Sequence, residues 1–213
     1  MNQPRPKIPP KHCCSEVIPE NSARSFSGPA ALVKKALRDK LIPRGSSVLE
    51  VGAGCLRNSN FLQRKGYRVS VIELEAVARR YRREYSRFLE IGGKLLSSWP
   101  PPQSFDVVVS TFTLETICMK GERNEHLNRL VQSVRTGGHI LIGVRGPKDV
   151  KTSVGKGRKC GDGYITPLKT FIKPFTVGEI SNQLEIRGTR ITKLYGGARQ
   201  NAPKIIEIVA KKT

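Results

Sequence analysis

The hydrophobic pattern from residue 47 onward alternates between short apolar runs and segments with helical spacing. The helical segments place apolar residues three or four positions apart, as Leu127, Leu130 and Val134 show. Strands are predicted at 48–51, 68–73, 105–110 and 139–144, with a weaker one at 93–98. Helices are predicted at about 29–40, 59–65, 76–88 and 122–135, and a turn at 136–138.

The last third of the chain departs from this rhythm. Residues 145–175 are rich in Gly and Lys and predict a basic insertion or lid. Thr176 and Glu179 have the spacing of a capping box, which predicts a helix to about 185. Two closely spaced strands, at 189–195 and 204–210, then predict an antiparallel hairpin on an otherwise parallel sheet. The alternation of strands and helices indicates an α/β fold with helices on both faces of the sheet.

The first 22 residues have a different composition from the rest. They are basic and rich in proline, which fixes φ and removes backbone donors, so a flexible, extended arm is expected. The remainder, 23–213, has the length of one domain. The N-terminal residues have no apolar h-region, and no stretch is apolar for the ~18 residues of a membrane span.

The charge and the cysteine content bear on the class of partner, the redox compartment and the presence of a metal site. The chain has 38 Lys and Arg against 17 Asp and Glu, a formal charge of +21, which favours a polyanionic partner such as DNA or RNA. Its five cysteines are odd in number and irregularly spaced, which argues against a disulfide framework and indicates a reducing cytoplasm. His12, Cys13, Cys14 and Cys160 lack C-x-x-C spacing, so no metal site is expected.

The segment V-L-E-V-G-A-G-C (48–55) carries the most informative motif. Gly52 and Gly54 let the backbone bend sharply and approach a ligand, and Glu73 ends the next strand, where its carboxylate can bind a ribose diol. A dinucleotide fingerprint would need a third glycine at position 57, which is Arg57. An adenosine cofactor without a pyrophosphate fits better, although a nicotinamide site or a structural turn stays open.

Together with F-D-V-V-V-S (105–110) and T-G-G (136–138), this loop resembles class I S-adenosylmethionine-dependent methyltransferases over residues 24–212. The resemblance implies a Rossmann-like sheet of order 3-2-1-4-5-7-6 with its last strand antiparallel, and S-adenosylmethionine as cofactor. R-S-F-S-G-P (24–29) and G-D-G-Y-I-T-P (161–167) look like a subgroup that includes members associated with DNA-modification gene clusters. The implied cofactor contacts are Glu50, Gly52, Ala53, Gly54, Asn58, Glu73, Ser98, Ser110, Thr111 and Phe112.

The acceptor is less well defined by the sequence. Ser110-Thr111-Phe112-Thr113 lacks the Pro-Pro pair used by enzymes that methylate base amines, so that standard chemistry is disfavoured. Asp162, Tyr164 and Glu115 are the candidates for a catalytic base. Cys118 is interpreted as a buried structural residue, and His126 as a surface residue. The predicted function is methyl transfer, with nucleic acid favoured as acceptor. A small-molecule methyltransferase and a non-catalytic cofactor-binding module are the alternatives.

Overall fold

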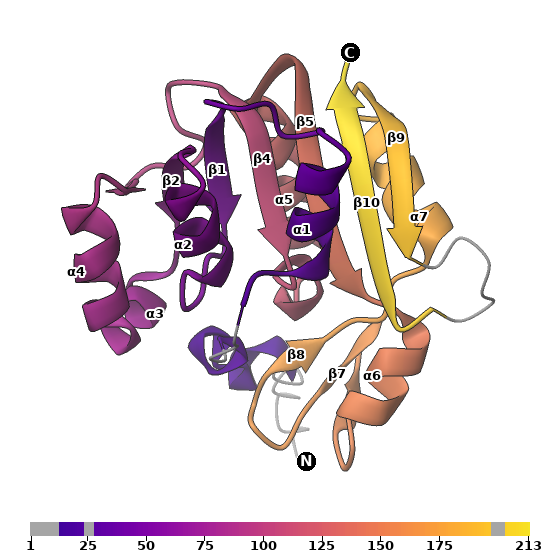
Figure 1. Cartoon of the computed structure of the whole chain (residues 1–213). Coiled ribbons are helices and arrows are strands. Elements are labelled where there is room, and N and C mark those ends of the chain that lie inside the picture. The colour runs from indigo at the N-terminus through magenta and orange to yellow at the C-terminus, as the bar shows by residue number, and fades with distance from the viewer. Residues whose placement is uncertain (1–12, 24–27, 197–202) are drawn as a thin grey trace, which may run out of the picture.

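The protein is built around one seven-stranded sheet (Figure 1). The computed structural model describes residues 13–23, 28–196 and 203–213. The strand order is β3-β2-β1-β4-β5-β10-β9, which confirms the order that the sequence implied. The strands are β1 Ser47–Val51, β2 Arg68–Ile72, β3 Lys94–Leu95, β4 Phe105–Thr111, β5 Val134–Arg145, β9 Thr189–Gly196 and β10 Ile205–Lys212.

Strand direction places the loops that could hold a ligand. The strands β3, β2, β1, β4 and β5 are parallel, and β10 pairs antiparallel with both β5 and β9. Val51 at the end of β1 pairs with Ile72 at the end of β2, so these two strands end side by side. The carboxyl ends of β1, β2 and β4 therefore meet at one edge, where open α/β sheets bind ligands.

Helices cover both faces of the sheet, as the alternating pattern predicted. On β1, Val48 packs into one apolar layer and Leu49 into the other, because successive side chains of a strand point to opposite faces. The first layer includes Leu62 and Phe88, and the second includes Leu130. The helices are α1 Ala31–Arg38, α2 Arg57–Arg64, α3 Glu75–Arg80, α4 Arg82–Glu90, α5 Lys120–Ser133, α6 Pro147–Ser153 and α7 Val177–Glu185.

Two local predictions were wrong. The helix expected at 76–88 is interrupted at Tyr81, which separates α3 from α4 and donates a hydrogen bond from its hydroxyl to the carbonyl of Ala23. The turn expected at 136–138 lies inside β5, where the register against β4 shifts. A Cβ on Gly138 would lie 2.7 Å from the carbonyl oxygen of Asp106, so the glycine permits close approach of two strands.

Asp106, part of the F-D-V motif, has a structural role. Its carboxylate accepts hydrogen bonds from the backbone N–H and hydroxyl of Ser47, at 2.7 and 2.8 Å, and pairs with Arg135 at 2.6 Å. These bonds lower its pKa to about 2, the backbone N–H of Ser47 being the largest cause. Asp106 therefore joins the starts of β1, β4 and β5, at the edge opposite the ligand-binding one.

The basic insertion is an ordered substructure. After α6 it forms a second, antiparallel sheet of β6 Arg158–Cys160, β7 Gly163–Ile165 and β8 Phe171–Ile172. The predicted capping box then opens α7, with the hydroxyl of Thr176 accepting the backbone N–H of Glu179 at 3.2 Å.

The described part of the N-terminal arm differs from the extended segment predicted. Residues 13–22 form two short 3₁₀ helices, η1 Cys13–Glu16 and η2 Pro19–Ser22. The backbone N–H of Ile18 bonds to the carbonyl of Lys169 at 2.8 Å, which ties this segment to the insertion. The first four prolines and His12 lie outside the described residues. Proline content alone misled the prediction, because it is blind to these long-range ties.

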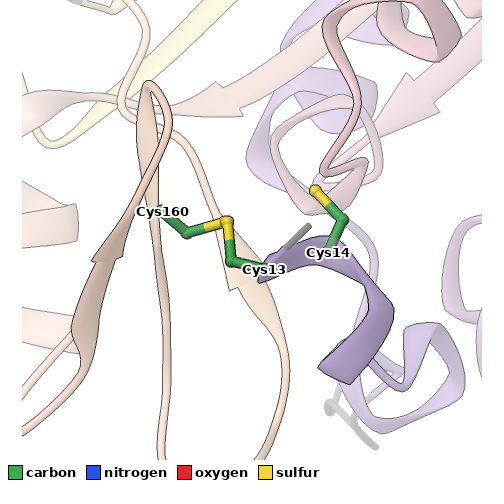
Figure 2. Close-up of side chains that lie close together, drawn as sticks. All are labelled: Cys13, Cys14 and Cys160. Atoms are coloured by element: carbon green, nitrogen blue, oxygen red, sulfur yellow. A yellow bond between two sulfur atoms is a disulfide. The ribbon is translucent and has the colours of Figure 1, made fainter. Parts of the chain in front are cut away.

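The cysteine prediction was also wrong. Cys13 is bonded to Cys160 (Figure 2) and Cys14 to Cys118, so the arm is joined both to β6 and to the loop after β4. Cys55 remains a free thiol. The pairs span 147 and 104 residues, which is why local spacing did not reveal them. None of the described helices combines the length and the apolar character that crossing a membrane requires.

Candidate active site

A cavity of about 750 Å³ lies at the carboxyl edge of the main sheet. This volume is in the range of small-molecule and cofactor sites. The ends of β1, β2 and β4 contribute Gly52, Glu73 and Phe112, and α5 contributes His126. The other wall belongs to the N-terminal segment, with Cys14, Val17, Pro19, Ser22 and Ala23. The sequence did not indicate this wall, because the arm was expected to be free of the domain.

The glycine bend borders the cavity as expected. Gly52 and Gly54 have φ of +75° and +55°, in the left-handed region that favours glycine. A Cβ on Gly52 would lie 2.2 Å from Oγ1 of Thr113, whereas one on Gly54 would meet nothing within 4 Å. The hydroxyl of Tyr85 donates to the carbonyl of Gly54 at 3.2 Å and fixes the bend from α4. Gly52 is thus required for packing, while Gly54 leaves open space.

Glu73 lies beside this bend, just after β2. One carboxylate oxygen accepts the backbone N–H of Gly54 at 2.6 Å and the other that of Leu74 at 2.7 Å. Burial raises the pKa of Glu73, and the two backbone hydrogen bonds oppose this effect. The carboxylate therefore has a fixed position at the cavity wall, within reach of a ligand that lies over the bend.

Glu50 and Asn58 support the bend from behind and do not line the cavity. Both are buried, and Glu50 accepts hydrogen bonds from Asn58 at 2.7 Å and from the hydroxyl of Ser59. Asn58 also bonds to the hydroxyl of Thr111 at 3.0 Å. Burial is the main cause that raises the pKa of Glu50 to about 7. Ala53 is buried as well, so the direct cofactor contacts predicted for Glu50, Ala53, Asn58 and Thr111 stay predictions.

Trp99 and His126 form a part of the site that the sequence analysis missed. Their rings meet edge-on with centroids 4.8 Å apart, and both line the cavity. Nε2 of His126 lies 3.1 Å from the hydroxyl of Ser110. Burial lowers the pKa of His126 to about 3, so the ring is neutral. Ser98, the predicted adenine contact, is exposed and lies outside the cavity lining.

The interpretation of His126 as a surface residue was wrong. His126 stands four residues before Leu130 and therefore shares the inner face of α5 with the apolar stripe. That spacing was a signal present in the sequence.

Phe112 has an unusual backbone conformation at the end of β4. Its φ is +60°, and its backbone N–H donates to the carbonyl of Gly143 at 2.7 Å. The guanidinium groups of Arg57 and Arg145 lie 5.5 and 5.7 Å from the centre of its ring. A non-glycine residue in this region is uncommon, and such strain often occurs at binding sites. Phe112 lines the cavity, and its contact with the cofactor near the transferred group stays a prediction.

Glu115 is buried behind this site. It is 0% exposed, and neither carboxylate oxygen has a hydrogen-bond partner among the described residues. Nε of Arg145 lies 3.7 Å from one of these oxygens. Burial raises the pKa of Glu115 to about 7, and the charge of Arg145 opposes the rise. Glu115 does not line the cavity, so its role as a base stays a prediction.

The other two candidate bases lie in the insertion. Asp162 pairs with Arg123 at 2.5 Å and lies 3.7 Å from Lys173, so its carboxylate is held by two cations. Tyr164 lies under the ammonium group of Lys159, 4.6 Å from its ring centre. Neither residue lines the cavity, and the structure does not bring them together with Glu73 or Phe112. The insertion faces the N-terminal segment, and that segment covers the cavity.

Comparison with known proteins identifies a related family of domains. A family model described as a methyltransferase domain matches residues 49–142, which run from within β1 through β2, β3 and β4 to most of β5. No curated protein matches the sequence.

Solved structures share the fold. The CcbJ methyltransferase from Streptomyces caelestis is 13% identical with a TM-score of 0.68, and the match covers 94% of this chain and 98% of that one. A SAM-dependent methyltransferase from Methanosarcina mazei is 18% identical (TM-score 0.66; coverage 83% and 96%). The 1,6-didemethyltoxoflavin-N1-methyltransferase from Burkholderia thailandensis, solved with S-adenosylhomocysteine, is 19% identical (TM-score 0.60; coverage 86% and 79%).

The residues present suit the cofactor that this family uses, S-adenosylmethionine. The carboxylate of Glu73, which the resemblance predicts to bind the ribose hydroxyls, lies beside an open glycine at Gly54, and the indole of Trp99 lines the same cavity. The match to a methyltransferase domain over residues 49–142 and the order of the strands show that the chain has the Rossmann-like fold of class I S-adenosylmethionine-dependent methyltransferases.

Proposed function

We propose that this chain transfers the methyl group of S-adenosylmethionine to a small acceptor that is neutral or cationic. The observation that carries the proposal is the position of Glu73, 2.6 Å from the backbone nitrogen of Gly54 at the wall of the cavity. Bound S-adenosylmethionine supplies an electrophilic methyl group. The chain's own residues hold the cofactor, orient the acceptor and exclude water.

In this proposal one side of the cavity binds the cofactor and the other side binds the acceptor. Glu73 and Gly54 lie at one side, with Trp99 nearby in the loop expected to meet adenine. Phe112 and Thr113 follow β4 and lie opposite the N-terminal segment, so an acceptor held there would lie between them and Ala23. Positioning alone can supply about 7–11 kcal/mol of the barrier to a reaction between two bound molecules.

The charges around the cavity favour a neutral or cationic acceptor. Three carboxylates line it, from Glu73, Glu122 and Glu125, while Arg129 is the one Lys or Arg residue among its described lining residues. The guanidinium of Arg129 lies against the ring of Trp99 at 5.4 Å and pairs with Glu125 at 2.7 Å. The chain as a whole carries +21, so its positive charge lies elsewhere. A polyanion would meet repulsion at this site.

Label transfer from radiolabelled S-adenosylmethionine into fractionated cell extract tests the acceptor class. We expect label in the small-molecule fraction with the native protein and none with Glu73→Ala. Glu75→Ala is the matched control, because Glu75 lies two residues further on, is exposed and does not line the cavity. Label in DNA or RNA would overturn the proposed acceptor class, and no label in any fraction would contradict methyl transfer.

Methylation of nucleic acid is the second candidate, favoured by the arginines of α3 and α4. These side chains are exposed, and α3 and α4 lie at one end of the sheet (Figure 1). The residues are Arg79, Arg80, Arg82, Arg83 and Arg87. If this candidate were correct, replacing Arg82, Arg83 and Arg87 with Gln would reduce methylation, and activity would fall steeply with salt. Our proposal predicts that this triple variant keeps the activity of the native protein.

A further inference from the structure

Four cysteine side chains from three separate parts of the chain lie close together. Cys13 and Cys14 come from η1, Cys118 from the loop after β4, and Cys160 from the end of β6. The sulfur atoms of Cys13, Cys14 and Cys160 all lie within 4.8 Å of one another. Figure 2 shows Cys14 beside the bonded pair of Cys13 and Cys160.

This convergence exceeds what two disulfides require. Each bridge needs only its own two sulfur atoms to meet, yet the sulfur atoms of Cys118 and Cys160, which belong to different bridges, lie 3.9 Å apart. In a tetrahedral zinc site with Zn–S distances of about 2.3 Å, two sulfur ligands are about 3.8 Å apart. We propose that, in the reduced chain, Cys13, Cys14, Cys118 and Cys160 bind one Zn²⁺ as a tetrahedral tetrathiolate.

The chemistry of the donor set supports zinc. Four thiols release four protons when they bind Zn²⁺, and the resulting group carries a net charge of −2. Soft thiolate ligands in tetrahedral geometry select Zn²⁺ over hard cations such as Mg²⁺. The adjacent pair Cys13-Cys14 departs from the usual C-x-x-C spacing, but η1 directs both sulfur atoms to the same place. The reduced form of the chain is the one expected in a reducing compartment such as the cytoplasm.

The surroundings suit a partly buried anionic site. Phe171 and Ile165 pack with the cysteines in a separate apolar cluster, which limits access of water. Arg123 has a side chain only 5% exposed and donates to the carbonyl of Cys118 at 2.7 Å. Arg158 and Lys159 directly precede Cys160 in the sequence.

A site with four protein ligands has no open position, so its role is structural. Cys14 and Cys118 line the cavity, and the four other N-terminal residues of its wall follow within ten residues of Cys13: Val17, Pro19, Ser22 and Ala23. The ion would hold this wall against β6 and the loop after β4. The inference concerns how the cavity is enclosed and does not depend on which acceptor is methylated.

The test uses the full chain, produced in a reducing cytoplasm with zinc supplied and purified without oxygen. We expect one zinc per chain by elemental analysis, and five reactive thiols after denaturation with a chelator. Replacement of zinc by Co²⁺ should give the visible bands of tetrahedral cobalt thiolates. Cys160→Ser should lose most of the bound zinc, whereas Cys55→Ser, at the free thiol, should keep one per chain.

Three results would overturn the inference. Protein without zinc whose mass is lower by four hydrogen atoms would hold two disulfides instead. Protein without zinc that has five reactive thiols in the native state would bind no metal. Iron with acid-labile sulfide would indicate an iron–sulfur cluster. If Cys160→Ser does not fold, the zinc content and cobalt spectrum of the native chain still decide between these outcomes.

Discussion

Replacing Gly52 with Ala tests whether the bend after β1 is held by the packing that the structure shows. The new Cβ would lie 2.2 Å from Oγ1, 2.6 Å from Cγ2 and 2.9 Å from Cβ of Thr113. The left-handed φ of +75° adds a cost of about 1–2 kcal/mol for a residue with a Cβ. Forcing a methyl group into a packed site typically costs about 1–3 kcal/mol more.

The two costs together destabilise the folded state by about 2–5 kcal/mol. For a chain of this length, thermal denaturation should then show Tm lowered by about 4–20 °C. Gly54→Ala is the matched control, since its Cβ meets nothing within 4 Å and only the backbone cost remains. The double variant Gly52→Ala/Thr113→Ala should recover part of the loss, because it removes the two closest atoms. A Gly52→Ala variant as stable as the native protein, or a double variant without any recovery, would refute this reasoning.

Two further substitutions test other parts of the fold. Thr176→Ala removes the hydroxyl that caps α7 and should lower the free energy of unfolding by about 1 kcal/mol in chemical denaturation; an unchanged midpoint would contradict the cap. Burial raises the pKa of Glu115 from 4.5 to about 7, so its contribution to stability is present below pH 4.5 and is lost as the pH rises through 7. Glu115→Gln should therefore match the native protein at about pH 4 and exceed its free energy of unfolding at about pH 8 by up to about 3 kcal/mol. An equal difference at both pH values would show that the carboxyl does not titrate in this way.

Much of the fold was predictable because its signals are local. The apolar runs at β1, β2 and β4 and the capping box at Thr176 depend on residues within a few positions of one another. The order of the strands came from the resemblance of the glycine loop and Glu73 to a family. The predicted bounds of helices and strands were wrong where tertiary contacts determine the local structure, as at Tyr81 and at Gly138.

The site was predictable in part. Glu73, Gly52, Gly54 and Phe112 were expected near the ligand, and all four line the cavity. Trp99 was missed because it follows a strand of only two residues, β3, whose pattern is weak. The N-terminal wall could not be predicted from composition, since it is held by contacts with residues more than a hundred positions away. Such long-range contacts produce no periodic pattern of residues in a single sequence.

The measurement that tests the central claim most directly is calorimetric titration with S-adenosylmethionine. The native protein should bind the cofactor, and Glu73→Ala should bind it about 10–150-fold more weakly, because hydrogen bonds to a charged group contribute about 1.5–3 kcal/mol. Glu75→Ala should bind like the native protein, and circular dichroism should show that both variants are folded. Native protein that gives no heat of binding, or a folded Glu73→Ala variant with unchanged affinity, would contradict the assignment of this cavity as the cofactor site.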